Sequence, residues 1–388
     1  MRILMVANPG SVHSQRWSAA LAARGHAVLL AGIRGAEIPG VEVVAFGPGR
    51  PDPRGRLLQA AGYAALGAGL AGLARRFRPD IVNAHYATTN GVLAALAGLR
   101  PRVVNIWGSD VIPDGTDRLS AAQRRLVRLG LERADAVIST SVFMLEQTRP
   151  LLRRVPPTHV IRWGVDRTLF ASAPTPSSAP ISPPISAPGP DAPVTIGWAK
   201  TFAEKYAPDL FLEAAARAAA AEPCLRFAMA GRGQGRAACE AMAERLGLGG
   251  RIAFPGFVPQ DAMPDFLRRL DVFVNTSRWH SESFGVVLVE AAACGIPVIA
   301  TDVGGVREAT APGEAALMVP RDDPDALAAA MLVLARDPAR RRAMGAAGQA
   351  LVARELDWDV SLARHEAILT ALATAHKTSN GASNRSPS

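Results

Sequence analysis

Residues 271–302 read DVFVNTSRWHSESFGVVLVEAAACGIPVIATD and decide the fold. The runs 272–275 and 297–301 are short and rich in β-branched residues, whereas 284–294 is long enough for a helix. A strand, a helix and a second strand in this order form a βαβ unit with parallel strands. The helix also holds one acid, Glu290, among apolar and small residues.

The same alternation of strand-like and helix-like segments runs along the chain of 388 residues. It is interrupted at 171–193 by a Pro/Ser/Ala tract, which is typical of a linker or a disordered loop. The chain is too long for one compact core. The sequence therefore predicts an α/β protein with two doubly wound parallel-sheet domains. Ligands of such domains bind beyond the carboxyl ends of the strands, and a cleft between the domains is the expected site.

This pattern also sets the expected domain boundaries. We expect an N-terminal domain over residues 1–170, the linker over 171–193 and a C-terminal domain over 194–357. A C-terminal helix over 358–375 is expected to pack back on the N-terminal domain, and 376–388 to form a disordered tail.

Composition narrows the range of partners. The formal net charge is +9, which favours anionic partners such as nucleotides or phospholipid surfaces. Aromatic residues are sparse, which argues against single-stranded nucleic acid. The three cysteines form no CxxC pair, so disulfides and zinc are not expected, and a reducing compartment is. Asp323 and Asp325 flank a proline before a helix and are interpreted as capping residues, so no metal is expected.

Two segments bear on contact with a membrane. The segment 57–74 is rich in Ala and Gly, so its insertion energy is poor, and a buried or membrane-lying helix is preferred to a true span. The segment 118–131 is a basic amphipathic helix, which fits either an anionic lipid surface or a solvated face. Its arginines are Arg118, Arg124, Arg125 and Arg128.

The position of Glu290 raises the question of what its carboxylate holds. Ser283 can cap the helix, and Phe284 and Gly285 then fall in its first turn, where free N–H groups attract an anionic or hydroxyl-rich ligand. Glu290 lies about two turns further along. A buried carboxylate must accept hydrogen bonds, and the two hydroxyls of a ribose would supply them. The alternative is a helix acid whose side chain extends to solvent or finds a backbone partner.

Two lysines follow the first strand of the second half, in the stretch GWAKTFAEKY. The ammonium groups of Lys200 and Lys205 suit a diphosphate that becomes more negative as it leaves. The alternative is a pair of solvated surface lysines. Lysine is scarce in this chain, where most positive charge is on Arg.

The segment ESFGVVLVEAAACGIPVIATDVGG, residues 282–305, closely resembles the signature of the retaining glycosyltransferases of family 4. That signature is Glu, seven residues and Glu, with Phe-Gly inside it and Cys-Gly-x-Pro-Val after it. AKTFAEKY resembles the basic loop of the family, and VIRWGVDRTLF resembles the segment that ends its first domain. The resemblance covers residues 1 to about 372 without the Pro-rich tract. It implies the GT-B fold, two Rossmann-like domains facing a central cleft.

The resemblance implies roles by position. Glu282 would lie beside the donor sugar, and Lys200 and Lys205 would bind the diphosphate and stabilise its departure. Glu290 would bind the ribose, and the backbone near Val258 would meet the base. The remaining donor contacts would come from Ser283, Phe284 and Gly285.

Two departures from the family pattern bear on the site. Members often have His where this chain has Trp107, and that His touches the donor sugar. Lys200 replaces an Arg and gives up its bidentate fork. The candidates to replace the missing His are His13, His85 and Asp110. Acceptors meet the first domain in enzymes of this fold, so the loop after the first strand is a candidate acceptor site, with Gly10, Ser11, His13 and Arg16.

Together these features predict a metal-independent retaining glycosyltransferase. It would move a hexosyl unit from a UDP- or GDP-sugar to a glycan or lipid-linked acceptor, in cell-surface polysaccharide or glycolipid biosynthesis. No cofactor and no nucleic-acid partner are expected. The expected location is the cytoplasm, with peripheral contact at the inner face of the plasma membrane as a further hypothesis. Two alternatives stay open: a sugar-nucleotide epimerase or hydrolase of the same fold, and a non-catalytic nucleotide-sugar-binding protein.

Overall fold

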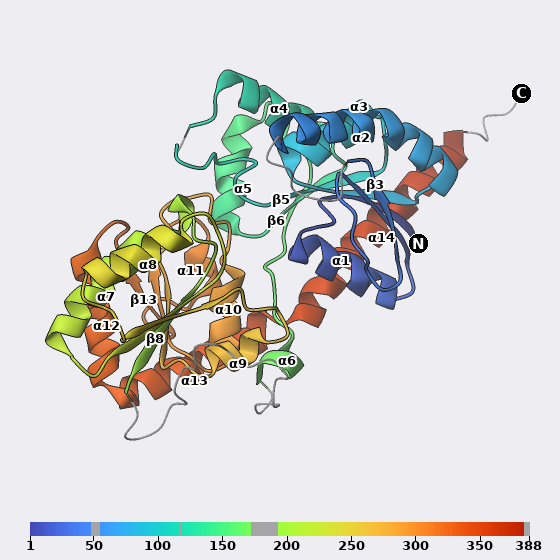
Figure 1. Cartoon of the computed structure of the whole chain (residues 1–388). Helices are drawn as coiled ribbons and strands as arrows, with labels where there is room; N and C mark the ends of the chain where they lie inside the picture. Colours follow the sequence, from blue (N-terminus) through green and yellow to red (C-terminus); the bar gives the residue numbers. More distant parts are fainter. Residues whose placement is uncertain (48–54, 117, 172–192, 384–388) are drawn as a thin grey trace, which may run out of the picture. The chain divides into compact units, whose positions relative to one another are not determined.

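The computed structural model describes residues 1–47, 55–116, 118–171 and 193–383. Its chain divides into two compact units, coloured along the sequence in Figure 1. Unit 1 consists of Met1–Ile161 and the C-terminal segment from Val360 onward, and unit 2 of Arg162–Asp359. Each unit is built on one sheet in which all pairs of neighbouring strands are parallel. The predicted fold class is confirmed.

The sheet of unit 1 has the strand order β3-β2-β1-β4-β5-β6-β7. Helices α2, α3 and α4 cover one face of it, and α1 and α14 cover the other (Figure 1). Because both faces are covered, β4 and β5 are buried at every residue. The strands are β1 Arg2–Val6, β2 Ala27–Gly32, β3 Val41–Ala45, β4 Ile81–His85, β5 Arg102–Ile106, β6 Ala136–Ser139 and β7 Thr158–Val160. The helices are α1 Val12–Ala23, α2 Gly55–Phe77, the π-helix η1 Ala87–Gly91, α3 Val92–Leu96, α4 Ala121–Leu131, α5 Val142–Thr148, the 3-10 helix η2 Arg149–Leu151 and α14 Trp358–Ser383.

The sheet of unit 2 has the order β10-β9-β8-β11-β12-β13. The predicted βαβ unit is β11, α10 and β12, and β11 pairs with β12 in parallel. The strands are β8 Thr195–Ala199, β9 Arg226–Ala230, β10 Ile252–Gly256, β11 Val272–Asn275, β12 Val298–Thr301 and β13 Ala316–Val319. The helices are α6 Arg167–Ala171, η3 Glu204–Tyr206, α7 Pro208–Ala221, α8 Arg236–Arg245, α9 Met263–Leu267, α10 Val286–Ala293, α11 Val306–Ala309, α12 Pro324–Arg336 and α13 Pro338–Glu355.

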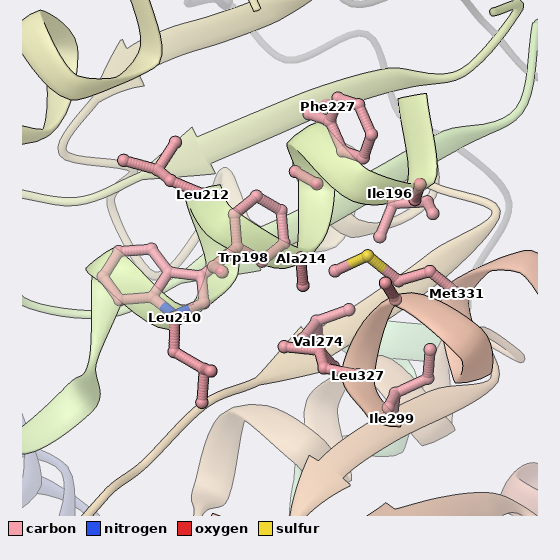
Figure 2. Close-up of a cluster of buried hydrophobic side chains, with 14 of the residues drawn as sticks. Ile196, Trp198, Leu210, Leu212, Ala214, Phe227, Val274, Ile299, Leu327 and Met331 are labelled. Atoms are coloured by element: carbon pink, nitrogen blue, oxygen red, sulfur yellow. The ribbon is translucent and has the colours of Figure 1, made fainter. Parts of the chain in front are cut away.

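Figure 2 shows one of the two hydrophobic clusters of unit 2, where α7 and α12 pack on the sheet. Successive side chains of a strand point to opposite faces. Val272 and Val274 therefore enter this cluster, whereas Phe273 enters the cluster on the other face, against α10. Each of these fully buried side chains contributes about 1.5–3 kcal/mol to the free energy of unfolding. The two clusters hold the carboxyl ends of β8 and β11 in fixed positions.

Both sheets contain a point where the strand order reverses. In unit 1, β1 lies between β2 and β4; in unit 2, β8 lies between β9 and β11. Ligands of doubly wound folds bind beyond the carboxyl ends of the strands at such a point. The fold therefore directs attention to the loops after β1 and β4 in unit 1, and after β8 and β11 in unit 2.

Two boundaries differ from those predicted. Unit 1 ends at Ile161 and not at residue 170, because Val165 and Phe170 are buried in a hydrophobic cluster of unit 2. The segment predicted as a tail from residue 376 is helical to Ser383, and Lys377 on it pairs with Asp80 at 2.6 Å between Nζ and Oδ1. Nearly all of the predicted linker, 172–192, lies outside the described residues.

The segment 57–74 belongs to α2, whose Leu66 and Leu70 are fully buried against the sheet of unit 1. It is therefore a helix of the core and not a span. Among the described residues, no helix combines the length and the apolar character needed to cross a membrane.

Candidate functional site

The loops after β8 and β11 bring together two residues predicted from the motifs. Nζ of Lys200 lies 2.8 Å from Oε2 of Glu282, and only about a tenth of each side chain is exposed. Oγ of Ser277 donates a second hydrogen bond to the same carboxylate oxygen at 2.8 Å. Burial raises the pKa of Glu282, but the charges of Lys200 and Lys205 and these two hydrogen bonds outweigh it, so the net pKa lies below its ordinary 4.5. Glu282 is thus ionised and held in place.

Lys205 lies at the same edge of the sheet, on the short helix η3. Its Nζ donates to the carbonyl of Ser281 at 3.3 Å. The ammonium groups of Lys200 and Lys205 lie 4.9 and 5.8 Å from the ring centroid of Tyr206, so one aromatic ring contacts both cations. The structure therefore brings the three predicted catalytic residues into one cluster, with Tyr206 as an additional member.

The loop that carries Glu282 is fastened from several directions. Its Arg278 forms ion pairs with Asp209 and Asp322, and the backbone N–H of Arg278 donates to the carbonyl of Lys205 at 2.8 Å. The carbonyl of Glu282 accepts from the N–H of Gly305 at 3.0 Å. A Cβ at Gly304 would lie 2.0 Å from that carbonyl, so glycine is required there. These contacts preorganise the acid before any ligand arrives.

Helix α10 begins later than the sequence predicts. Gly285 is its N-cap, with φ +85°, and the helix starts at Val286. The predicted cap by Ser283 is wrong, since no side chain caps this helix; Ser283 and Phe284 precede it. Phe284 is 1% exposed and belongs to the same buried cluster as Val258, itself 7% exposed. Because Gly285 adopts the left-handed conformation, the helix begins two residues later than a cap at Ser283 would place it.

Glu290 is 4% exposed and points toward the loop after β10. Its Oε1 accepts a hydrogen bond of 2.6 Å from Nε2 of Gln260. The amide of a side chain thus satisfies part of the hydrogen-bonding capacity of the buried carboxylate. Gln260 was not predicted as a site residue, because 30 positions separate it from Glu290 and no motif links them.

A second pair that the sequence does not indicate lies at this edge. The guanidinium of Arg232, after β9, stacks 4.4 Å above the ring of Phe257, after β10, and Phe257 is 51% exposed. An exposed aromatic ring beside Val258 and Gln260 offers a flat surface to a planar ligand. In the sequence, this pair is marked by no motif, and Phe257 is noticeable only as an apolar residue in a predicted loop.

In unit 1, the loop after β1 and the first turns of α1 contain four of the predicted acceptor-side residues. The N–H of Gly10 donates to Oδ1 of Asn8 at 3.1 Å. Ser11 is the N-cap of α1 without a side-chain hydrogen bond, and Arg16 is half-buried on that helix. The ring of His13 lies edge-on to Trp107, with 5.7 Å between centroids. The structure thus joins His13 to the position where the family often has His.

The two remaining candidates, His85 and Asp110, flank the same tryptophan. The ring of His85 lies 5.3 Å from Trp107. The carboxylate of Asp110 accepts from the backbone N–H groups of Ala87, Trp107 and Gly108 at 2.8–3.0 Å. Burial raises the pKa of Asp110, and these hydrogen bonds only partly offset it. Asp110 is therefore committed to holding two loops together, which argues against a direct ligand contact.

Among the described residues, no group of three or more His, Cys, Asp or Glu side chains is arranged to hold a metal ion. The predicted capping role of Asp323 is confirmed: it is the N-cap of α12, and its Oδ1 accepts from the N–H of Ala326 at 2.9 Å.

The chain has two parallel-sheet units, and charged and hydroxyl side chains lie at the point where the strand order of unit 2 reverses. This architecture is that of two-domain α/β proteins with the GT-B fold. The profile "Glycosyl transferases group 1" matches residues 188–351, and the profile "Glycosyl transferase 4-like" matches 2–141. The chain belongs to glycosyltransferase family 4.

Two relatives of the chain carry the names of glycosyltransferases. A D-inositol 3-phosphate glycosyltransferase of Thermomonospora curvata is 41% identical over 167 residues, 41% of this chain and 38% of the relative. The chain thus matches about two-fifths of the length of that relative. A GDP-mannose-dependent alpha-(1-6)-phosphatidylinositol monomannoside mannosyltransferase of Mycolicibacterium smegmatis is 29% identical over 72% of each chain.

Two solved structures show the same fold along nearly the whole chain. Sucrose-phosphate synthase of Thermosynechococcus elongatus aligns with a TM-score of 0.82 at 20% identity, over 97% of this chain and 100% of that one. Alr3699/HepE of Anabaena, solved in complex with UDP and glucose, aligns with a TM-score of 0.77 at 22% identity, over 96% and 100%.

Proposed function

We propose that the protein is a retaining glycosyltransferase that moves a hexosyl unit from a UDP- or GDP-sugar to a hydroxyl of a glycan or lipid-linked acceptor. Membership of family 4 and the names of the relatives, which are glycosyl- and mannosyltransferases, support the reaction class. The observation that carries the proposal is the cluster of Lys200, Lys205 and Glu282 at the switch point of unit 2. We propose that the reaction needs no metal ion.

Charge explains how this cluster would act. When the anomeric C–O bond to the diphosphate breaks, negative charge grows on the leaving oxygens. Two ammonium groups fixed at one edge of the sheet stabilise that charge without reorganising. Two of the three lysines in the sequence, Lys200 and Lys205, lie here.

In the proposed transfer, the acceptor oxygen bonds to the anomeric carbon on the face that the diphosphate leaves, which retains configuration. The acceptor hydroxyl loses its proton to an oxygen of the leaving diphosphate, so atoms and charge balance. Glu282 stabilises positive charge at the sugar ring as a fixed carboxylate. Its existing ion pair with Lys200 limits it to an electrostatic and positioning role, not a nucleophilic one.

The donor nucleoside is assigned to the loop after β10 and helix α10. Glu290, whose Oε1 accepts from Gln260, would also accept hydrogen bonds from the ribose hydroxyls. The base would lie by Val258, with the exposed ring of Phe257 beside it. The N–H groups of Phe284 and Gly285, with Ser283, would contact the sugar.

The proposed acceptor context is polysaccharide or glycolipid synthesis at the inner face of the plasma membrane. Two hydrogen bonds join helix α4 to η2 and to the segment that follows it. Arg128 donates to the carbonyl of Leu151, the last residue of η2, at 2.8 Å, and the N–H of Arg153 donates to Glu132 at 2.7 Å. Exposed cations and apolar side chains on these segments suit an anionic bilayer. They are Arg124, Arg125, Leu126, Arg153, Arg154 and Val155.

Binding of the donor tests the proposed function first. A panel of UDP- and GDP-sugars is scanned by thermal shift, since a ligand that binds only the folded state raises the Tm. We expect one donor to raise the Tm of wild type and of Glu314→Ala, an exposed control in unit 2. Glu290→Ala should weaken that donor at least tenfold. An unchanged affinity in Glu290→Ala refutes the ribose assignment.

Nucleotide release then tests the reaction. Release should require an added acceptor and should fall at least 100-fold in Lys205→Ala, with Lys377→Ala as the matched lysine control. Fast release without any acceptor refutes the transferase in favour of a hydrolase or epimerase.

The membrane contact needs its own measurement. Wild type should sediment with phosphatidylglycerol vesicles at low salt but not with phosphatidylcholine vesicles. Arg124→Glu with Arg125→Glu should abolish sedimentation, whereas Arg340→Glu with Arg342→Glu, exposed on α13, should not. Equal sedimentation of the two double variants would contradict the assignment to α4.

A further inference from the structure

Strand β11 ends in polar residues that the fold buries completely. Asn275 is the last residue of the strand, Thr276 and Ser277 follow it, and all three are 0% exposed. Since side chains alternate along a strand, Asn275 points to the same face as Phe273, which is the face against α10. The loop that carries Glu282 starts here. Buried polar side chains at this position need hydrogen-bond partners inside the protein.

The neighbouring strands fix the backbone of this turn. On one side, Nε1 of Trp198 in β8 donates to Oγ1 of Thr276 at 2.9 Å, and that hydroxyl donates to the carbonyl of Tyr206 at 2.7 Å. On the other side, the hydroxyl of Thr301 in β12 donates to the carbonyl of Ser277. The side chain of Ser277 therefore starts from a fixed position in the sheet.

The hydroxyl of Ser277 lies between two oxygens. Its Oγ is 2.8 Å from Oε2 of Glu282 and 2.9 Å from Oδ1 of Asn275. A serine hydroxyl has one proton and donates it to one acceptor. Because Glu282 is paired with Lys200 and ionised, it accepts the proton of Ser277 in preference to a neutral amide oxygen. Oγ of Ser277 and Oδ1 of Asn275 are then two facing oxygens without a proton between them.

A half-turn of the Asn275 amide removes this conflict. It exchanges Oδ1 and Nδ2, so that Nδ2 lies 2.9 Å from Oγ of Ser277 and donates to it. Before the half-turn, Nδ2 is buried and has no hydrogen-bond partner within the described residues. After it, a carbonyl oxygen takes that place, and unsatisfied buried carbonyls are less rare in proteins than unsatisfied buried N–H groups.

The resulting hydrogen bonds all run toward the carboxylate. Nδ2 of Asn275 donates to Ser277, and the hydroxyl of Ser277 donates to Oε2 of Glu282. Nζ of Lys200 donates to the same oxygen at 2.8 Å. In an interior of low dielectric, each bond of such a chain polarises the next and strengthens it. A buried amide two positions before Ser277 thus supports the negative charge of Glu282.

The charged groups that face Glu282 are cations. Burial raises the pKa of Glu282, and the charges of Lys200 and Lys205 together with the hydrogen bonds bring it below 4.5. Within the loop, Arg278 pairs with two aspartates, as described above, and Nδ1 of His280 accepts from a backbone N–H after β12 at 3.1 Å. Lysines keep their charge in the acid range, so a change in the pKa of Glu282 reports on its hydrogen bonds.

We propose that Asn275 and Ser277 are positioning residues for Glu282, joined in a relay that runs from the amide of Asn275 through the hydroxyl of Ser277 to the carboxylate. The relay keeps the carboxylate in one orientation and in its charged form. Both residues act through Glu282 and not by contact with a substrate. The consequence for catalysis rests on the proposed function, in which Glu282 is a fixed negative charge beside the donor sugar.

The relay is tested first by the pKa of the Glu282 carboxyl, which requires no substrate. The whole chain is labelled with glutamate that carries 13C at the carboxyl carbon and is titrated by NMR, and the signal missing from Glu282→Gln identifies the residue. In Ser277→Ala the pKa should rise by about one pH unit, because the carboxylate loses a charge-assisted hydrogen bond. Ser277→Thr keeps the hydroxyl and should stay within about 0.3 pH unit of wild type. An unchanged pKa in Ser277→Ala overturns the relay.

Asn275→Val decides which end of the amide faces Ser277. If Nδ2 donates, its loss weakens the relay and the pKa of Glu282 rises, by at least about 0.3 pH unit. If Oδ1 accepts instead, its loss frees the serine proton for the carboxylate and the pKa falls. A fall or an unchanged pKa therefore overturns the relay. Asn275→Ala replaces the valine variant if that one fails to fold. The matched control is Thr310→Val, which removes a buried hydroxyl bonded to the carbonyl of Val306 at 3.1 Å and should leave the pKa unchanged.

Kinetics then separate positioning from a merely structural role. With donor and acceptor present, Ser277→Ala should lower kcat about tenfold and leave KM for the donor within about twofold. The acid limb of its pH–rate profile should move upward by the same amount as the pKa in the NMR titration. A lower Tm with an unchanged kcat and an unchanged acid limb would refute positioning. Wild type that consumes no donor refutes the proposed function, whereas the NMR titration still decides the relay.

Discussion

Replacing His85 by phenylalanine should make the protein less sensitive to acid. Burial lowers the pKa of His85 from 6.5 to about 3, with a smaller effect of the charge of His365. His85 therefore binds a proton near pH 6.5 in the unfolded chain but only near pH 3 in the folded chain. The free energy of unfolding contributed by the neutral ring is complete above pH 6.5 and declines as the pH falls below it.

The size of the effect follows from the width of this window. Each pH unit below 6.5 costs about 1.36 kcal/mol per histidine. At pH 5 the loss is therefore about 2 kcal/mol for His85, relative to pH 7.5. His365, whose pKa burial lowers to about 4, loses a similar amount. The phenylalanine variant keeps only the loss from His365.

Urea unfolding followed by tryptophan fluorescence measures this difference, because Trp17 and Trp107 lie beside the two histidines. Wild type should lose about 4 kcal/mol between pH 7.5 and 5 from the two rings, and His85→Phe about 2 kcal/mol. The comparison uses the change with pH, so a uniform packing cost of phenylalanine cancels. Equal losses in wild type and variant would refute the inference that His85 is buried and neutral.

Three further outcomes are expected. Asp110→Ala leaves three backbone N–H groups without their acceptor and should lower the free energy of unfolding by about 3 kcal/mol, seen as a lower urea midpoint; a change below about 1 kcal/mol would show that Asp110 does not hold the loops. Gly285→Ala meets Cδ1 of Leu288 at 2.8 Å and a φ of +85°, so a loss of about 1–3 kcal/mol is expected, and an unchanged Tm would contradict it. The pKa of Glu282 is held below 4.5, so the stability that Glu282 contributes is present above pH 4.5 and is lost as the pH falls through the lowered pKa. Glu282→Gln should therefore remove this acid step from a plot of Tm against pH. A step in the variant as large as the step in wild type would argue against the pair of Glu282 with Lys200.

Sequence patterns predicted the structure correctly where residues close together in the chain determine it. Apolar β-branched runs separated by amphipathic segments predicted both parallel sheets, and Asp323 before a proline predicted the cap of α12. The predicted helix cap at Ser283 was wrong, because Gly285 adopts a left-handed conformation and is itself the N-cap, which the preference of serine for cap positions does not predict. The end of unit 1 was misplaced for a different reason: Phe170 contacts residues far along the chain.

The sequence by itself determined the fold class, the family and the identity of the charged residues, because periodicity and motif spacing are properties of the chain. Only the tertiary structure decided which of those residues meet. Lys200 and Glu282 are 82 positions apart, and they pair because β8 and β11 are neighbours in the sheet. Likewise the bond between Asn83 and His365 spans 282 positions, and His85 is left unpartnered beside it within the described residues. Strand order and helix packing bring these side chains together, and neither is encoded in any short stretch.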